Sequence, residues 1–152
     1  MTALLATLVL IYRQLATKDM STSEATAIKL PFSIYTAWIS VAIIANITAL
    51  LVKVGWAGWG LSDSSWVVVV LVVSTLIGLG VGLVWRDPAF IWVFVWAFFG
   101  ILVNHVTTLN GKYQDVIITL TVLMPILAVY ALLMGIGHLM VLREQRTSIR
   151  GS

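Results

Sequence analysis

Five stretches of apolar residues alternate with short polar segments along the chain. The helices that they predict cover about residues 2–16, 30–52, 66–85, 89–106 and 116–142. A hydrocarbon core of about 30 Å requires roughly 20 apolar residues per helix, and the last four stretches approach or exceed that length. The first stretch reaches Arg13 after too few apolar residues to cross a bilayer alone. The pattern predicts an all-α fold, an integral membrane bundle of about five transmembrane helices, the first short or truncated.

Turn and cap residues support these boundaries. Pro31 stands in the first turn of the second stretch, and Asp87 with Pro88 forms an N-cap followed by a first-turn proline before the fourth. Asn110 and Gly111 form a turn signal before the last stretch. Because no segment with the composition of an interdomain linker separates these helices, we expect residues 1–152 to form a single transmembrane helical domain.

The composition excludes several classes of protein. Hydrophobic residues make up 61% of the chain and charged residues 10%, whereas about a quarter of the residues in a soluble domain are charged. A net charge of +3 is too small for a nucleic-acid-binding module. The absence of cysteine excludes a disulfide framework, a thiolate metal site and a cysteine nucleophile.

The basic residues predict an orientation in the membrane. When the helices alternate across a bilayer, Lys53 and Lys112 fall on one side and seven basic residues on the other. These seven are Arg13, Lys18, Lys29, Arg86, Arg143, Arg146 and Arg150. The positive-inside rule therefore places loops 17–29 and 86–87 and the carboxy terminus on the cytoplasmic side. The amino terminus then lies outside, before a helix too short to span, so we expect the chain to be part of a longer one.

The acidic residues argue against an enzyme. All six lie in loops or at helix ends, where solvated or capping carboxylates are the ordinary interpretation. Catalysis or ion pumping within a membrane requires ionisable groups at depth. We therefore expect a non-enzymatic protein without a metal site.

Two histidines are candidate axial ligands for a pigment. His105 lies near the end of the fourth helix, and His138 follows Asp115 by 23 residues, about 34 Å of helix. The two cannot hold one haem between them, but either could ligate a haem or chlorophyll singly. The alternative is an interfacial histidine with an ordinary hydrogen bond.

Asn46 is the one strongly polar side chain near the middle of a predicted span. In hydrocarbon its amide requires a partner, either on another helix or on a ligand. Trp38 lies on the same helix, at helical spacing from several alanines, where it could cover a flat ligand or a neighbouring helix.

Aromatic residues form two stripes on the fourth helix. One consists of Trp92, Trp96 and Phe99, and the other of Phe90, Phe94 and Phe98. Packing and lipid contact explain such stripes, and so does a helix that contacts protein on one face and a π-rich ligand on the other. Seven tryptophans with almost no buried charge favour a flat hydrophobic ligand over an ion or a sugar. Trp56, Trp59, Trp66 and Trp85 are placed as an interfacial belt.

Three segments carry a resemblance to a known family. They are Leu30-Pro31-Phe32-Ser33-Ile34-Tyr35 with its continuation through Trp38 to Asn46, Gly55-Trp56-Ala57-Gly58-Trp59-Gly60, and Phe94-Val95-Trp96-Ala97-Phe98. The chain resembles the tryptophan-rich sensory proteins related to the TspO/MBR translocator family. It is most similar to the carboxy-terminal portion of the longer branch, whose members carry extra helices after a five-helix core.

The resemblance implies a membrane protein whose relatives bind tetrapyrroles or sterols and act in sensing or transport. It implies that Pro31, Trp38 and Asn46 correspond to the last core helix, which lines the ligand cavity. The family's amino-terminal signature, a Pro-Ala-Gly turn before an aromatic-rich Ser-Ile-Trp helix, is absent from this sequence.

Two functions remain open from the sequence. The first is a sensory or transport protein that binds a flat hydrophobic ligand, namely a tetrapyrrole such as porphyrin, haem or chlorophyll, with Trp38, Asn46, Trp92 and Trp96 as binding residues. The alternative is an accessory subunit of a larger photosynthetic or respiratory complex that binds pigment or lipid. The expected partners are the lipid bilayer, a hydrophobic small molecule, and other membrane chains or a second copy of this chain.

Overall fold

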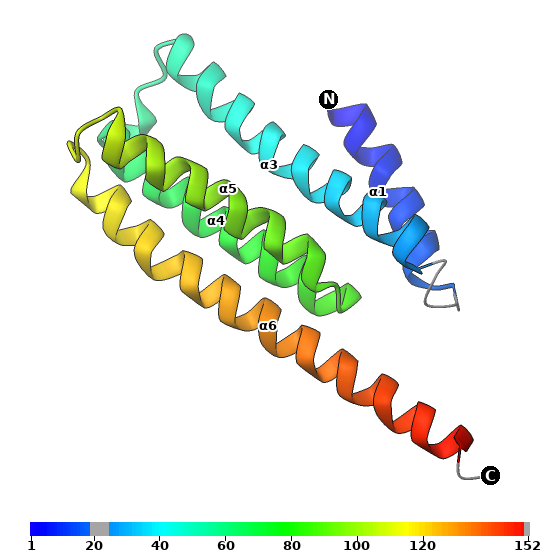
Figure 1. The fold of residues 1–152 in the computed structure, drawn as a ribbon. Helices are drawn as coiled ribbons and strands as arrows, with labels where there is room; N and C mark the ends of the chain where they lie inside the picture. The colour runs from blue at the N-terminus through cyan, green and yellow to red at the C-terminus, as the bar shows by residue number, and fades with distance from the viewer. Residues whose placement is uncertain (19–24, 151–152) are drawn as a thin grey trace.

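The computed structural model describes residues 1–18 and 25–150, with the backbone alone for residues 16, 25, 26, 52, 138, 139 and 141–150. The long helices are α1 (Thr2–Ala16), α3 (Leu30–Lys53), α4 (Asp63–Trp85), α5 (Pro88–Thr107) and α6 (Gln114–Arg150) (Figure 1). Two short helices, η1 (Ala25–Lys29) and η2 (Gly58–Gly60), lie in the connections. These described residues contain no strand, and the predicted all-α bundle of five long helices is confirmed.

Four helices in the described part of the chain are long and apolar enough to cross a membrane. Their spans are Ala27–Leu51, Asp63–Trp85, Pro88–Thr107 and Gln114–Gly137, whereas the apolar segment Thr2–Leu15 is shorter. The boundary that differs most from the sequence prediction is the end of α6, which continues from 142 to Arg150. The first charge of the tail marks the end of the apolar stretch, but Arg, Glu and Gln are good helix formers and extend the helix.

The ends of α4 and α5 are fixed by polar caps. The Ser62 hydroxyl accepts a hydrogen bond from the Ser65 N–H at 3.2 Å. Asp87 Oδ1 accepts from the N–H groups of Ala89, at 3.0 Å, and Phe90, at 3.4 Å. Arg86, with φ 48°, ends α4 in a left-handed conformation and so allows the tight turn into α5.

Helix α5 lies at the centre of the bundle, where it packs against α3, α4 and α6, while α1 packs against α3. The stripe of Phe90, Phe94 and Phe98 is buried in the core. Trp92, Trp96 and Phe99 lie on the exposed side of the same helix. The two predicted aromatic stripes therefore occupy a protein-facing and an outward-facing surface.

Two glycines let α4 approach α5 closely. A Cβ at Gly78 would lie 3.3 Å from the Phe94 ring, and one at Gly82 would lie 2.7 Å from Ile91 Cγ1. Their G-x-x-x-G spacing is common in membrane helices and does not distinguish a contact within the chain from one between subunits. The structure places the pair in the internal contact between α4 and α5.

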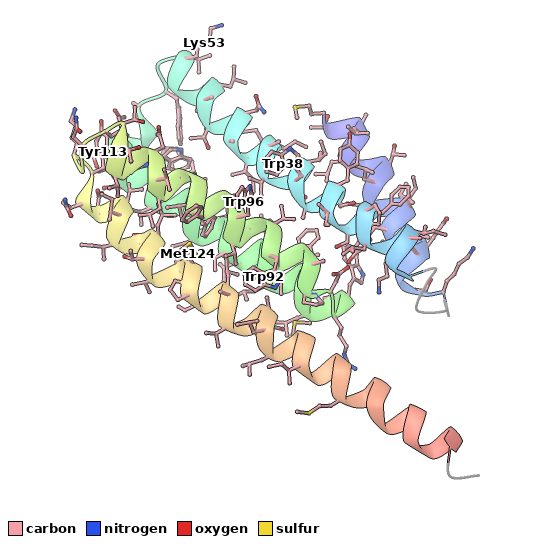
Figure 2. All side chains as sticks on the ribbon, in the orientation of Figure 1. Trp38, Lys53, Trp92, Trp96, Tyr113 and Met124 are labelled. Carbon is pink, nitrogen blue, oxygen red and sulfur yellow. The ribbon has the colours of Figure 1, made fainter. Side chains whose placement is uncertain are left out.

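The connections alternate between the two ends of the bundle (Figure 1). One end of the bundle contains the end of α1, the start of α3 and the turn between α4 and α5. The basic residues in these segments are Arg13, Lys29 and Arg86. Lys53, labelled in Figure 2, lies at the opposite end, as does the α5–α6 connection with Lys112. This arrangement matches the alternation on which the predicted orientation depends.

Candidate functional site

Three of the tryptophans singled out in the sequence line one pocket between α3 and α5. We call it the tryptophan pocket; it has a volume of about 460 Å³ and is lined by Ile34, Trp38, Ala89, Trp92, Val93 and Trp96. Ile34 and Trp38 are four residues apart on α3, and Trp92 and Trp96 are four apart on α5. Each pair therefore lies on one face of its helix. Figure 2 shows Trp38 on α3 and both other tryptophans on α5.

The pocket is open toward the outside of the bundle. Trp38 is 49% exposed and Trp96 66% exposed, so substantial parts of their rings are free to contact another molecule. Val93 beside them is buried and joins the pocket to the core. No charged side chain of the described residues lines the pocket. Such a surface can hold an apolar aromatic molecule by ring stacking and exclusion of water or lipid.

Asn46 lies apart from the tryptophan pocket. Its side-chain N–H donates to the carbonyl of Ala42 on its own helix at 2.7 Å, and Nδ2 lies 3.8 Å from the Met1 sulfur on α1. The amide therefore finds its main partner within α3, with α1 beside it. The structure does not bring Asn46 together with the three tryptophans.

The histidines also lie apart from this pocket. His105, in the last turn of α5, has Nδ1 2.9 Å from the carbonyl of Ile101. Because a carbonyl only accepts, Nδ1 is the donor in this bond. The ring of Tyr113 lies edge-on at 6.1 Å. The side chain of His138 lies outside the described part of the structure.

A second apolar cavity lies between α3, α4 and α5. It has a volume of about 310 Å³, and Ala45, Ala49, Leu71, Ser74 and Phe98 are among its lining residues. Sequence reasoning placed the two alanines on a small-residue face. It gave no signal for the cavity, which depends on how three helices meet.

A buried polar cluster lies where α1 meets the turn between α4 and α5. The Tyr12 hydroxyl donates to Asp87 Oδ2, and Tyr12, Ser33 and Asp87 are all buried. The Ser33 hydroxyl has no hydrogen-bond partner among the described residues. The sequence identified Asp87 as a cap, which is confirmed, but not its contact with Tyr12. The residues lie in separate helices, so no spacing rule connects them.

A metal centre is not evident in the described part of the chain. No group of three or more His, Asp or Glu side chains there is close enough to hold a metal ion. The tryptophan pocket has aromatic faces and is open to the outside of the bundle. It also contains three of the binding residues predicted from the sequence.

A comparison with family models connects this architecture to known proteins. The model described as TSPO-like protein matches residues 1–133, which is most of the chain. The chain belongs to the TSPO-like protein family. No curated protein and no solved structure matches it. The predicted relationship to TspO is therefore confirmed.

The matched region of this TSPO-like protein contains every residue of the tryptophan pocket. It begins in α1 and ends within α6, so it includes the four apolar spans almost completely. His138 lies beyond it. Family membership and the four spans together establish a membrane protein of the TspO type.

Proposed function

We propose that this protein is a non-enzymatic receptor or carrier that binds a flat hydrophobic ligand in the tryptophan pocket. The observation that carries the proposal is the convergence of Trp38 from α3 with Trp92 and Trp96 from α5 around one space of about 460 Å³. That volume falls within the range of about 300–1,000 Å³ that is usual for small-molecule pockets.

The lining favours a planar ligand over other classes. Indole faces attract rings through offset stacking, and each aromatic contact adds about 0.5–1.5 kcal/mol beyond the area buried. Aliphatic side chains, Ile34 and Val93 among them, can contact the edges of such a ring system. Because the described lining contains no charged residue, an ion or a sugar would lose its hydration without compensation. A tetrapyrrole meets these conditions and is the ligand class that we propose.

The ligand would be held by its faces and not by an axial bond from His105. No histidine is among the described residues that line the tryptophan pocket. His105 is nine residues beyond Trp96, about 13.5 Å along α5. A metal-free porphyrin is therefore as suitable a ligand as a haem or a chlorophyll.

A ligand in this position would connect two helices that carry different parts of the molecule. α5 is packed into the core, whereas α3 bears α1 on another side. A ligand bound in the tryptophan pocket would stabilise one position of α3 relative to α5. Such a ligand-dependent shift between conformations is the physical basis of a sensory role. For either a sensory or a transport role, we propose that loops 17–29 and 86–87 and the carboxy terminus face the cytoplasm.

An accessory subunit of a larger membrane complex is the second candidate. Trp96 and Phe99 lie on the outward side of α5 with ring centroids 6.1 Å apart, and both are substantially exposed. A helix of a partner chain could cover this pair. In that case the tryptophans would bind protein, and porphyrin would compete with the partner.

The experiment that tests the proposal is a titration of the purified chain with metal-free protoporphyrin in lipid nanodiscs. Trp38→Leu and Trp92→Leu should each weaken binding by roughly three- to tenfold, because each removes one stacking face. Trp59→Leu is the matched control, since Trp59 is 83% exposed and lies outside the tryptophan pocket. Equal affinity in all variants would contradict the proposed site, and stable co-purification with other chains would favour the subunit.

A further inference from the structure

The apolar cavity between α3, α4 and α5 continues toward the Gly/Trp connection between α3 and α4. A neighbouring space of about 200 Å³, which we call the loop pocket, shares Thr48 and Val67 with the cavity. Its other lining residues include Trp56, Gly58, Asp63 and Trp66. The cavity and the loop pocket therefore adjoin at these two residues.

The two spaces differ in chemistry. The larger cavity is lined by aliphatic side chains with Phe98 and the hydroxyl-bearing Thr48 and Ser74. The loop pocket includes the acidic residue Asp63 and the aromatic residues Trp56 and Trp66 in its lining. Carboxylates and aromatic faces both attract cations, and aromatic surfaces are the usual sites for quaternary ammonium groups. The lining is thus apolar at one end and suited to a cation at the other.

Trp66, which lines the loop pocket, has a buried indole N–H without an acceptor among the described residues. The rings of Trp56 and Trp66 meet edge-on, with centroids 4.6 Å apart. A buried N–H without an acceptor costs about 1–3 kcal/mol. Because Nε1 is shielded from solvent, a ligand in the loop pocket contacts the ring of Trp66 and not this N–H.

We propose that the cavity and the loop pocket together bind one zwitterionic phospholipid with an ammonium head group. One acyl chain lies in the cavity, and the ammonium group contacts Asp63 and the indole faces of the loop pocket. The position agrees with such an occupant. α4 begins at Asp63, so the loop pocket lies at the end of the apolar spans, at head-group level.

The backbone of the connection holds the aromatic residues in place. Trp59 has φ 53° and follows Gly58, which has φ 58°. A left-handed conformation is unusual for a bulky residue and persists only where its surroundings enforce it. The ring of Trp59 lies 5.3 Å from that of Trp56 and 6.0 Å from that of Trp66. These contacts keep the head-group residues of the loop pocket in one arrangement.

The test uses the full chain in nanodiscs of phosphatidylglycerol with a minor fraction of phosphatidylcholine of the same acyl composition. Both lipids carry the phosphate, and only one carries the ammonium group. After gentle release, native mass spectrometry measures which lipid stays bound. We expect phosphatidylcholine to be enriched about fivefold over its share of the bilayer. Retention in proportion to the bilayer, or preference for phosphatidylglycerol, would overturn the proposal.

Three variants locate the bound lipid. Asp63→Asn removes the charge at nearly constant shape, and Trp66→Leu removes an indole face; each should reduce the enrichment severalfold. Ala45→Leu fills the cavity and should abolish it. Ala6→Leu on α1 is the matched control, because Ala6 is exposed and lies outside both spaces. Enrichment that is the same in all four variants would overturn the assignment to this site.

The lipid site and the tryptophan pocket have no residue in common. The two proposals therefore succeed or fail separately. Loss of porphyrin binding in Trp38→Leu with unchanged lipid enrichment supports the assignment of the lipid to the cavity and the loop pocket. Displacement of the lipid by porphyrin from wild-type protein would overturn that assignment.

Discussion

The Tyr12 hydroxyl of α1 donates a hydrogen bond to the Asp87 carboxylate, which also caps α5. The Tyr12 ring meets that of Trp85 edge-on at 4.6 Å and stacks near Phe90 at 6.4 Å. Helix α1 is too short to span a membrane, and in this chain its long-range packing is mainly against α3. The contact with Asp87 therefore gives α1 a second attachment, to the turn between α4 and α5.

Removal of the Tyr12 hydroxyl should destabilise the protein measurably. Tyr12→Phe leaves a buried carboxylate oxygen without its donor, at a cost of about 1–3 kcal/mol in the free energy of unfolding. Denaturant unfolding in mild detergent, followed by circular dichroism, measures this change. Tyr35→Phe is the control, because the Tyr35 side chain is exposed. Similar losses in the two variants would contradict a special role for the Tyr12 hydroxyl.

The two roles of Asp87 can be separated. Asp87→Ser retains a good N-cap for α5, but its shorter side chain cannot maintain the bond to Tyr12. Combined with Tyr12→Phe, it should cost about 1 kcal/mol less than the sum of the single changes. Full additivity in this double-mutant cycle would indicate that the hydroxyl and the carboxylate do not interact energetically.

Glycine should be required at position 82 and not at position 80. A Cβ at Gly82 would meet the buried Ile91 side chain, whereas a Cβ at Gly80 meets nothing within 4 Å. Gly82→Ala should cost about 1–3 kcal/mol through overpacking. Gly80→Ala should gain about 0.5–1 kcal/mol from backbone entropy. The thermal unfolding midpoint in detergent measures both.

A second substitution distinguishes steric contact from other effects at Gly82. Ile91→Val removes Cδ1, the atom nearest to the added methyl group. The Gly82→Ala change should therefore cost less in an Ile91→Val background than in the wild type. An unchanged cost would mean that the close approach of α4 to α5 is not its origin.

Substitution of His105 should leave porphyrin affinity unchanged. His105 is not among the residues that line the tryptophan pocket, and its Nδ1 is engaged by the Ile101 carbonyl. The absorption spectrum and the dissociation constant of the protoporphyrin complex should be the same for His105→Gln and wild type. A tenfold weaker complex in the variant would instead assign the ligand to the α5–α6 end of the bundle.

The four spans could be predicted from the sequence because the bilayer acts on each helix separately. Length and apolar composition decide whether a segment such as Asp63–Trp85 crosses a membrane, before any contact forms. The cap at Asp87 is also local and follows from residue type. The two aromatic stripes of α5 follow from helical spacing alone.

The relation between helices could not be predicted in the same way. Trp38 and Asn46 were expected in one site, but eight residues turn a helix by two full turns and about 80° more and move along it by about 12 Å. That rotation takes Asn46 away from the tryptophan pocket and toward Met1 on α1. The contact between Tyr12 and Asp87 likewise depends on where α1 lies against α3. The spacing of residues along one helix contains no information about which residues of other helices they contact.

The most direct test of the central claim is ¹⁹F NMR of protein labelled with 5-fluorotryptophan, with and without metal-free protoporphyrin. Single Trp→Phe variants assign the seven resonances. The ring current of a bound porphyrin acts over short distances, so the signals of Trp38, Trp92 and Trp96 should shift while those of Trp56, Trp59, Trp66 and Trp85 stay in place. Shifts confined to the second group, or none at saturating porphyrin, would contradict ligand binding in the tryptophan pocket.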